Sequence, residues 1–245
     1  MFNLSVVLPI CNEEGILERN VTALERHLAA IPHLDAFEII LVCNGCRDDS
    51  ERLSRALEAR YPNRIRALCL EARGLGRAIR AGIDAASHAC IMFYAVDLPF
   101  GLTVFEDSIA AARTNPNRVV IGSKGHADSH VPRTLARRMF SAAISLLNNL
   151  IFSLHVRDTQ GSLLFPRAIF ERYHASMDSP GAFFQAQIVI YGRLMGCELL
   201  EIPVRLADAG RARSTRFNAF GDAARYVAAV FREKLKLTVG PTARG

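Results

Sequence analysis

The sequence lacks a secretion signal, an internal repeat and a low-complexity linker. Its first fifteen residues have neither the basic start nor the small-residue cleavage site of a signal peptide, so we expect no secretion. At 245 residues the chain is long enough for one α/β domain or two small ones.

Cysteine pairs of the kind that build disulfide frameworks or zinc sites are also lacking. Most of the six cysteines lie in apolar runs, which is typical of buried free thiols in a reducing compartment. Cys43 and Cys46 form a CxxC sequence, but no second pair and no nearby histidine completes a zinc ligand set. We therefore predict a cytoplasmic protein with free thiols.

No hydrophobic run has the character of a membrane span. The longest uncharged run, residues 139–156, reaches the lower limit of length, but Asn148 and Asn149 lie in its middle. We expect a buried helix, or one that rests on a membrane surface. The net charge of +6 favours anionic partners such as phosphate esters or anionic lipids. No nucleic-acid partner is expected, because the basic residues are not interleaved with aromatic ones.

Short apolar runs alternate with amphipathic stretches through the first half of the chain. The runs predict strands at residues 4–9, 37–42, 65–70 and 89–95, and the stretches between them predict helices at 13–31, 48–61 and 75–86. Such alternation indicates an α/β fold with a mostly parallel sheet and helices on both faces. In these folds ligands bind at the carboxyl ends of the strands.

The second half is less regular. It predicts strands at 118–123, 161–166 and 197–207, and helices at 183–196 and 219–237. A further long helix is expected from about residue 134 through the uncharged run. Residues 208–218 form a basic loop, and the end of the chain is expected to fray.

Several motifs, in this order, resemble those of the family 2 glycosyltransferases with the GT-A fold, a Rossmann-like α/β fold. The branch that the chain resembles is that of the polyprenyl-phosphate (dolichyl-phosphate) mannose and glucose synthases. In the first half the motifs are VVLPICNEE (6–14), ILVCNGCRDDS (40–50), ARGLGRAIRAGI (72–83) and FYAVDLPF (93–100). In the second half they are VIGSK (120–124), VPRTLARRMFS (131–141), VRDTQGSLLF (156–165) and LLEIPVRL (199–206).

The resemblance implies one GT-A domain over residues 1–236, with a nucleotide-binding half (1–115), an acceptor half (116–236) and a tail (237–245). It implies an inverting transfer from a nucleotide-diphosphate sugar, usually with Mg²⁺ or Mn²⁺, to a polyprenyl phosphate. It also implies peripheral contact with the inner face of a membrane. The residues expected to bind the donor are Pro9, Cys11, Asn12, Glu13, Asn44, Gly74, Gly76 and Asp97.

The acceptor half of the motif set is intact. Arg137 and Ser141 are four residues apart on one predicted helix and so face the same way. The oxygen of a lipid phosphate is already anionic, so its attack needs no strong base. The residues expected to hold acceptor or leaving phosphates are Lys124, Arg137, Ser141, Thr159, Gln160, Arg211 and Arg213, and those expected to be catalytic are Asp97, Arg137 and Asp158.

Where the chain departs from the family pattern, neutral residues stand at positions that are usually acidic. The first metal carboxylate is Ala95, two further acids are Cys43 and Asn44, and the acidic pair of a later helix is Gln185 and Gln187. A divalent cation binds several hard oxygens, and Asp97 alone supplies one side-chain anchor. Whether a metal is used is therefore left open.

Two other functions fit the same residues. A non-catalytic GT-A module that binds a partner or a lipid would explain the neutral crevice. A transferase that acts on a small hydroxyl-bearing acceptor would need a general base, for which Asp158 is the candidate. The sequence names neither the sugar, the base of the nucleotide nor the oligomeric state.

Overall fold

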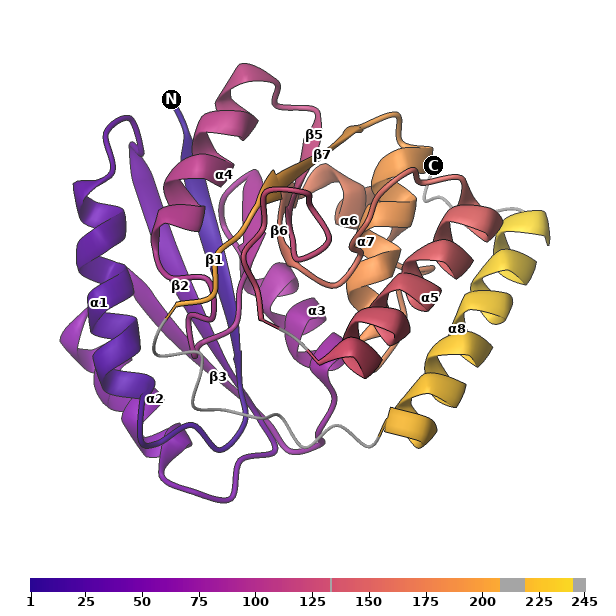
Figure 1. Cartoon of the computed structure of the whole chain (residues 1–245). Helices are drawn as coiled ribbons and strands as arrows, with labels where there is room; N and C mark the ends of the chain where they lie inside the picture. Colours follow the sequence, from indigo (N-terminus) through magenta and orange to yellow (C-terminus); the bar gives the residue numbers. More distant parts are fainter. Residues whose placement is uncertain (133, 208–218, 240–245) are drawn as a thin grey trace.

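The computed structural model describes residues 1–132, 134–207 and 219–239, and a seven-stranded sheet runs through it (Figure 1). The strand order is β3-β2-β1-β4-β6-β5-β7. The strands are β1 (Asn3–Ile10), β2 (Ala36–Asn44), β3 (Ile65–Leu70), β4 (Cys90–Phe93), β5 (Arg118–Ser123), β6 (Ser162–Pro166) and β7 (Glu198–Pro203). Only β6 runs antiparallel to its neighbours, β4 and β5, which confirms the mostly parallel sheet.

Helices cover both faces of the sheet, as the alternating pattern predicted (Figure 1). On one face α1 (Leu17–Ala30), α2 (Ser50–Arg60) and α4 (Thr103–Thr114) share an apolar core with the strands. On the other face the core is formed with α3 (Leu75–Ala85), α6 (Ala168–Tyr173) and α7 (Phe183–Leu194). Alternate residues of β1 serve the two cores, since Val6 and Leu8 belong to the first and Val7 to the second.

An outer layer of two helices covers α7. These are α5 (Leu135–Phe152) and α8 (Ala219–Val239), which lie side by side in Figure 1 and contact each other. Their presence explains why α7 is buried all round over residues 183–192, whereas a helix at the surface would keep one polar face.

The predicted helix through residue 156 is too long. α5 ends at Phe152 because the side chain of Asn149 closes its end, accepting from the Val156 amide and donating to the Val156 carbonyl oxygen at 2.8 Å. Ser153 and His155 then adopt positive φ angles that no helix contains. Asn148 is buried and donates to Thr159 and Tyr226, so both central asparagines have partners within the protein.

Other element boundaries differ less. The strand predicted at 197–207 ends at Pro203, because the chain then pairs with the loop at His130, which accepts from the Leu206 amide. α1 begins at Leu17 rather than residue 13, after a turn on the Glu13 carbonyl oxygen, and α8 extends to Val239. Helices α4 and α6 were not among the predicted elements.

No helix in the described ranges is both long and apolar enough to cross a membrane. All six cysteines are free thiols, as predicted. Cys43 and Cys197 are buried and the other four are partly buried.

Candidate functional site

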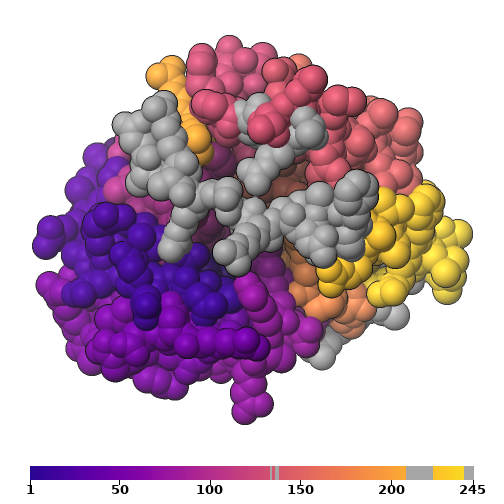
Figure 2. All heavy atoms as spheres, turned by 60° about the horizontal axis from the view of Figure 1, so that its bottom comes forward, coloured from indigo at the N-terminus to yellow at the C-terminus, as the bar shows by residue number. Residues whose placement is uncertain are grey.

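The strand topology brings the predicted donor loops to one edge of the sheet. β1, β2, β3 and β4 are parallel neighbours, so the loops that follow them emerge together. The antiparallel β6 adds the segment that precedes it to the same edge. Figure 2 shows this side of the molecule, with the first half of the chain facing the half that contains α7 and α8.

Side-chain hydrogen bonds fix the first three loops to one another. Asn12 has a positive φ of 58°, and its Oδ1 accepts from the Arg47 amide at 2.8 Å. The Glu13 amide donates to Ser50 Oγ at the start of α2, also at 2.8 Å. Asn44 is buried, and its Oδ1 accepts from the Gly74 amide at 2.7 Å. The loops therefore form a preformed platform.

Two of the residues discussed for this site lie away from the open edge. Cys43 points into the core under α2, with its Sγ 3.3 Å from Ser54 Oγ, and burial raises its pKa to about 12. Gly76 is buried, and its amide donates to the Pro180 carbonyl oxygen at 3.0 Å. Gly76 thus permits close contact between α3 and the 179–181 loop. Pro9 and Cys11 are partly buried at the edge.

A tight turn after β4 holds Asp97. The buried hydroxyl of Tyr94 accepts from the Phe100 amide at 2.9 Å and donates to the Gly101 carbonyl oxygen at 3.0 Å. Leu98, next to Asp97, has a φ of 48°, a strained conformation that a leucine adopts only when its surroundings enforce it. Asn20 of α1 also donates to the Val96 carbonyl oxygen. The turn that carries Asp97 therefore contains one strained residue and is fixed by these three hydrogen bonds.

The carboxylate of Asp97 is partly buried, and no second acid beside it is found among the described residues. Burial raises the pKa of Asp97 above its ordinary value, and no ion pair to it exists among the described residues. Within the described parts of the chain, no three His, Cys, Asp or Glu side chains are grouped so that they could hold a metal ion. With Ala95 in the first position, these residues do not fit a cation site built by the protein itself.

On the side of the edge where the acceptor is predicted to bind, Asp158 and Lys124 form a pair. Asp158 is buried and lies 3.2 Å from Lys124 Nζ, and its oxygens also accept from the amides of Lys124 and Gln160. Lys124 Nζ donates to the Gln160 carbonyl oxygen at 2.8 Å. Asp158 and the Gln160 carbonyl oxygen together fix the ammonium group of Lys124 at the end of β5.

The other predicted acceptor residues are placed differently. Thr159 is buried, and its hydroxyl accepts from Asn148 at 3.0 Å, so it joins α5 to the strand edge. Ser141 is partly buried on α5. The backbone of Arg137 belongs to α5 one turn earlier, but its side chain, like Arg211 and Arg213, lies outside the described part of the chain.

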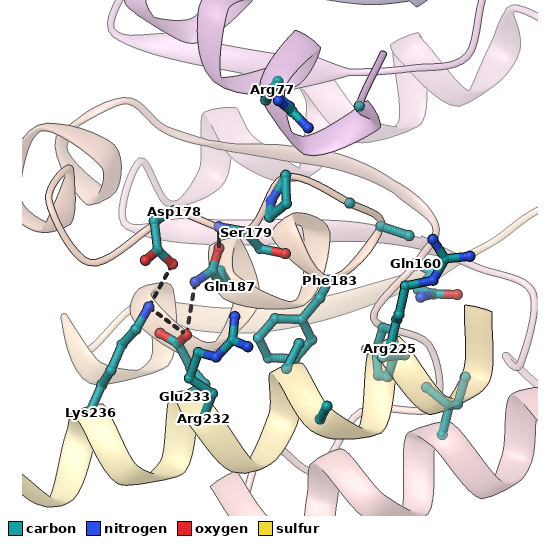
Figure 3. A pocket seen from close by; sticks show the side chains of 18 of the residues that line it. Arg77, Gln160, Asp178, Ser179, Phe183, Gln187, Arg225, Arg232, Glu233 and Lys236 are labelled. Atoms are coloured by element: carbon teal, nitrogen blue, oxygen red, sulfur yellow. Dashed lines mark hydrogen bonds and ion pairs between the residues drawn. The ribbon is translucent and has the colours of Figure 1, made fainter. Parts of the chain in front are cut away.

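A cavity of about 600 Å³ opens beside this edge, between α3, the 178–182 loop, α5 and α8 (Figure 3). Gly74 and Gln160 connect it to the donor loops and the acceptor segment. At one end Lys236 bridges Asp178 at 2.5 Å and Glu233 at 3.4 Å. The cationic side chains that line it are Arg73, Arg77, Arg225, Arg232 and Lys236.

The sequence reading missed the residues that hold this region together. Glu233 is buried on α8 and accepts from Tyr191 and from Gln187, one of the two glutamines that replace family acids. Tyr94 and Asn20 were missed as well. The sequence did contain a signal for Tyr94, because a tyrosine hydroxyl in an otherwise apolar run needs a hydrogen-bond partner when it is buried. None existed for the bonds of Glu233 to Gln187 and Tyr191, which are more than forty residues away.

Comparison with known proteins agrees with this architecture. The sequence profile described as Glycosyl transferase family 2 matches residues 5–174, well over half of the chain. The chain belongs to this family. It is 26% identical over 240 residues to Glycosyltransferase AglD of Haloferax volcanii, covering 97% of this chain and 38% of that protein. The family 2 chain thus spans less than half the length of this relative.

Solved structures show the same GT-A fold. Glucosyl-3-phosphoglycerate synthase of Mycobacterium tuberculosis superposes with a TM-score of 0.66 at 20% identity, covering 95% of this chain and 80% of that one. A complex of the same enzyme with Mn²⁺, UDP and phosphoglyceric acid gives a TM-score of 0.66 at 18% identity, covering 95% and 78%. The sequence profile shows the family of the chain, and these structures support its fold.

Proposed function

We propose that this glycosyltransferase moves a sugar from a nucleotide-diphosphate sugar to a polyprenyl phosphate, at the cytoplasmic face of a membrane. The observation that carries the acceptor is the outer layer of the fold. α5 exposes Leu146 and Leu150, which is 73% exposed, and α8 exposes Phe231 at 58% and Leu235 at 65%. On each helix the exposed apolar residues recur at helical spacing, as on a helix that lies in a membrane interface.

The charges on the same two helices support this acceptor. Among the described side chains of α5 and α8, every exposed charged one is basic: Arg138, Arg225, Arg232 and Lys234. Basic residues beside an apolar row attract the anionic lipids of a cytoplasmic leaflet, by about 1 kcal/mol for each charge near the surface. An acceptor embedded in the bilayer would then meet the enzyme at α5, next to Ser141.

In the proposed reaction an oxygen of the acceptor phosphate attacks the anomeric carbon of the donor sugar. The bond from that carbon to the diphosphate breaks with inversion, and the nucleoside diphosphate leaves with the electron pair. Asn12, Glu13 and Asn44 would hold the nucleoside, and Asp97 would orient the donor. Lys124, with Arg137, Ser141, Arg211 and Arg213, would stabilise the phosphate charges. No base is required, in keeping with an Asp158 that is already engaged by Lys124.

The solved relatives of similar fold support the donor class. One complex contains Mn²⁺, UDP-glucose and phosphoglyceric acid, so a nucleotide sugar and an anionic acceptor occupy that enzyme together. A divalent ion carried in with the donor diphosphate would supply charge neutralisation here. The residues around Asp97 provide too few ligands to bind one alone, so the proposal includes no step through a metal.

The test is a transfer assay with labelled nucleotide sugars, offered a polyprenyl phosphate in detergent or phosphoglycerate in solution. We expect label in the lipid extract, and a loss of at least tenfold in Asp97→Ala but not in Arg26→Gln, an exposed residue of α1. If the label appeared only in the soluble product, the acceptor would be a small molecule and not a lipid. Donor binding without transfer to any acceptor would favour a binding module.

Membrane contact is tested separately by sedimentation with vesicles that contain or lack phosphatidylglycerol. Phe231→Glu and Leu150→Glu should lose binding to the anionic vesicles, whereas Leu194→Glu should retain it. Leu194 is an exposed leucine at the end of α7, outside the two apolar rows, and so provides a matched control. Equal binding by all three variants would contradict the membrane assignment.

A further inference from the structure

The cavity beside the donor loops has more positive charge than its own acids neutralise. Both acids in its lining are already paired, because Lys236 bridges Asp178 and Glu233, and Glu233 also accepts from Tyr191 and Gln187. By contrast, Arg73, Arg77 and Arg232 form no ion pair with any described residue. Three guanidinium groups around one hollow create a positive potential that an anion would relieve.

Apart from Gln160, Ser179 and Gln187, the side chains in the remainder of the lining are apolar or aromatic. Phe183 and Tyr226 meet edge to face with ring centroids 5.2 Å apart, and Phe140, Ile144 and Ala229 complete the wall. In Figure 3 the Phe183 ring lies over α8, between the Lys236 end and the Arg225 end of the cavity. The Tyr226 hydroxyl accepts a hydrogen bond from Asn148, so only the apolar part of the ring faces the cavity.

We infer that this cavity binds a phosphate monoester with an apolar chain, the phosphate on Arg73, Arg77 and Arg232 and the first prenyl units against Phe183 and Tyr226. The inference rests on the proposed function and gives its acceptor a binding site. The volume of about 600 Å³ lies within the range of small-molecule pockets. One guanidinium group can donate two parallel hydrogen bonds to two oxygens of the same phosphate, which suits the phosphate of a monoester.

The position of the cavity fits this role. Its wall includes Phe140 and Ile144, which flank Ser141 on α5, and it opens at Gly74, whose amide belongs to the donor platform. The cations in it differ from Lys124, Arg137, Arg211 and Arg213, which were expected to hold acceptor or leaving phosphates. The cavity is therefore an additional site, which would hold the acceptor next to the donor loops.

The test is calorimetric titration of the whole chain with farnesyl phosphate, farnesol, inorganic phosphate and 3-phosphoglycerate. Farnesyl phosphate should bind, and the other three should each bind at least tenfold more weakly, since each lacks the phosphate or the apolar chain. Binding of 3-phosphoglycerate as tight as that of farnesyl phosphate would overturn the assignment to a lipid phosphate.

Variants locate the site. Arg73→Gln and Arg232→Gln should each weaken farnesyl phosphate binding about tenfold, equivalent to ~1.4 kcal/mol. Ala228→Glu places a carboxylate in the exposed rim of the cavity and should weaken binding more than Ala228→Gln, which has the same size. Arg26→Gln serves as the distant control. Unchanged binding in both arginine variants and in Ala228→Glu would refute the site.

A parallel transfer assay separates the two proposals. If farnesyl phosphate accepts sugar while all cavity variants bind and react normally, the function stands and the cavity assignment fails. If the cavity variants lose farnesyl phosphate binding as expected but no nucleotide sugar yields a product, the cavity assignment stands and the proposed function fails.

Discussion

The substitution Gly76→Ala would test how closely the start of α3 must pack against the 179–181 loop. A Cβ built there lies 2.1 Å from the Ser179 carbonyl oxygen and 2.7 Å from that of Gly181, where ordinary contact begins at 3.4 Å. The loop must therefore move by about an ångström, and backbone atoms cannot rotate away as a side-chain end can. Such overpacking costs about 1–3 kcal/mol.

The other contributions to the Gly76→Ala change can be assigned from the structure. Movement of the loop lengthens the 3.0 Å hydrogen bond from the Gly76 amide to the Pro180 carbonyl oxygen, at a cost of about 1 kcal/mol. Alanine gains about 1 kcal/mol over glycine within a helix, and Gly76 lies in the first turn of α3. The net loss in free energy of unfolding is thus about 1–3 kcal/mol.

Urea unfolding followed by circular dichroism measures this loss, and thermal unfolding should show a decrease of about 3–10 °C. Gly181→Ala is the matched control, because a Cβ there meets nothing within 4 Å and the φ angle lies outside the left-handed region. It should stay within about 0.5 kcal/mol of the wild type. A Gly76→Ala protein as stable as the Gly181→Ala protein would refute the packing argument.

Three further predictions concern the carboxylates. Ala95→Asp should create Mn²⁺ binding that calorimetry can measure, because two carboxylates, at positions 95 and 97, would then be available as ligands in place of one. An unchanged titration would show that the geometry of the turn does not suit a cation. Asp97→Asn should raise the free energy of unfolding at pH 7. Burial lifts the folded-state pKa above the ordinary 3.8, so wild-type stability falls as pH rises through that pKa, and the advantage of the variant should vanish below about pH 3.8. Asp158→Asn should lower transfer because Lys124 loses its partner, and the double variant Asp158→Asn/Lys124→Met should be no worse than Lys124→Met alone; additive losses would instead indicate a separate role for Asp158 as a base.

The layered α/β architecture was predictable because apolar runs and amphipathic stretches differ in period. The strands predicted at 65–70 and 118–123 coincide with β3 and β5. The pattern of α4 is also present in the sequence, with Val104, Phe105, Ser108 and Ile109 on one face, although it was not among the predicted helices. The direction of β6 was not predictable, since an apolar run of five residues reads the same for either direction of pairing.

The candidate site was predictable to the level of its loops. The edge at which they meet follows from the parallel topology. The roles assigned to Asn12, Asn44 and Lys124 stay predictions. The cavity was not foreseen, because Arg73 and Arg232 come together only when α8 folds back over α7, a long-range contact that local patterns do not encode.

The place of β6 in the sheet has a consequence for how the chain is made. β4 has one side against β1, and its other side pairs with β6, which is synthesised about 70 residues later. At roughly 5–20 residues per second, a ribosome leaves that apolar edge open for several seconds. An open strand edge is a template for joining another chain, so an arrest of translation between these two strands would release an adhesive fragment that needs a chaperone until the missing strand arrives.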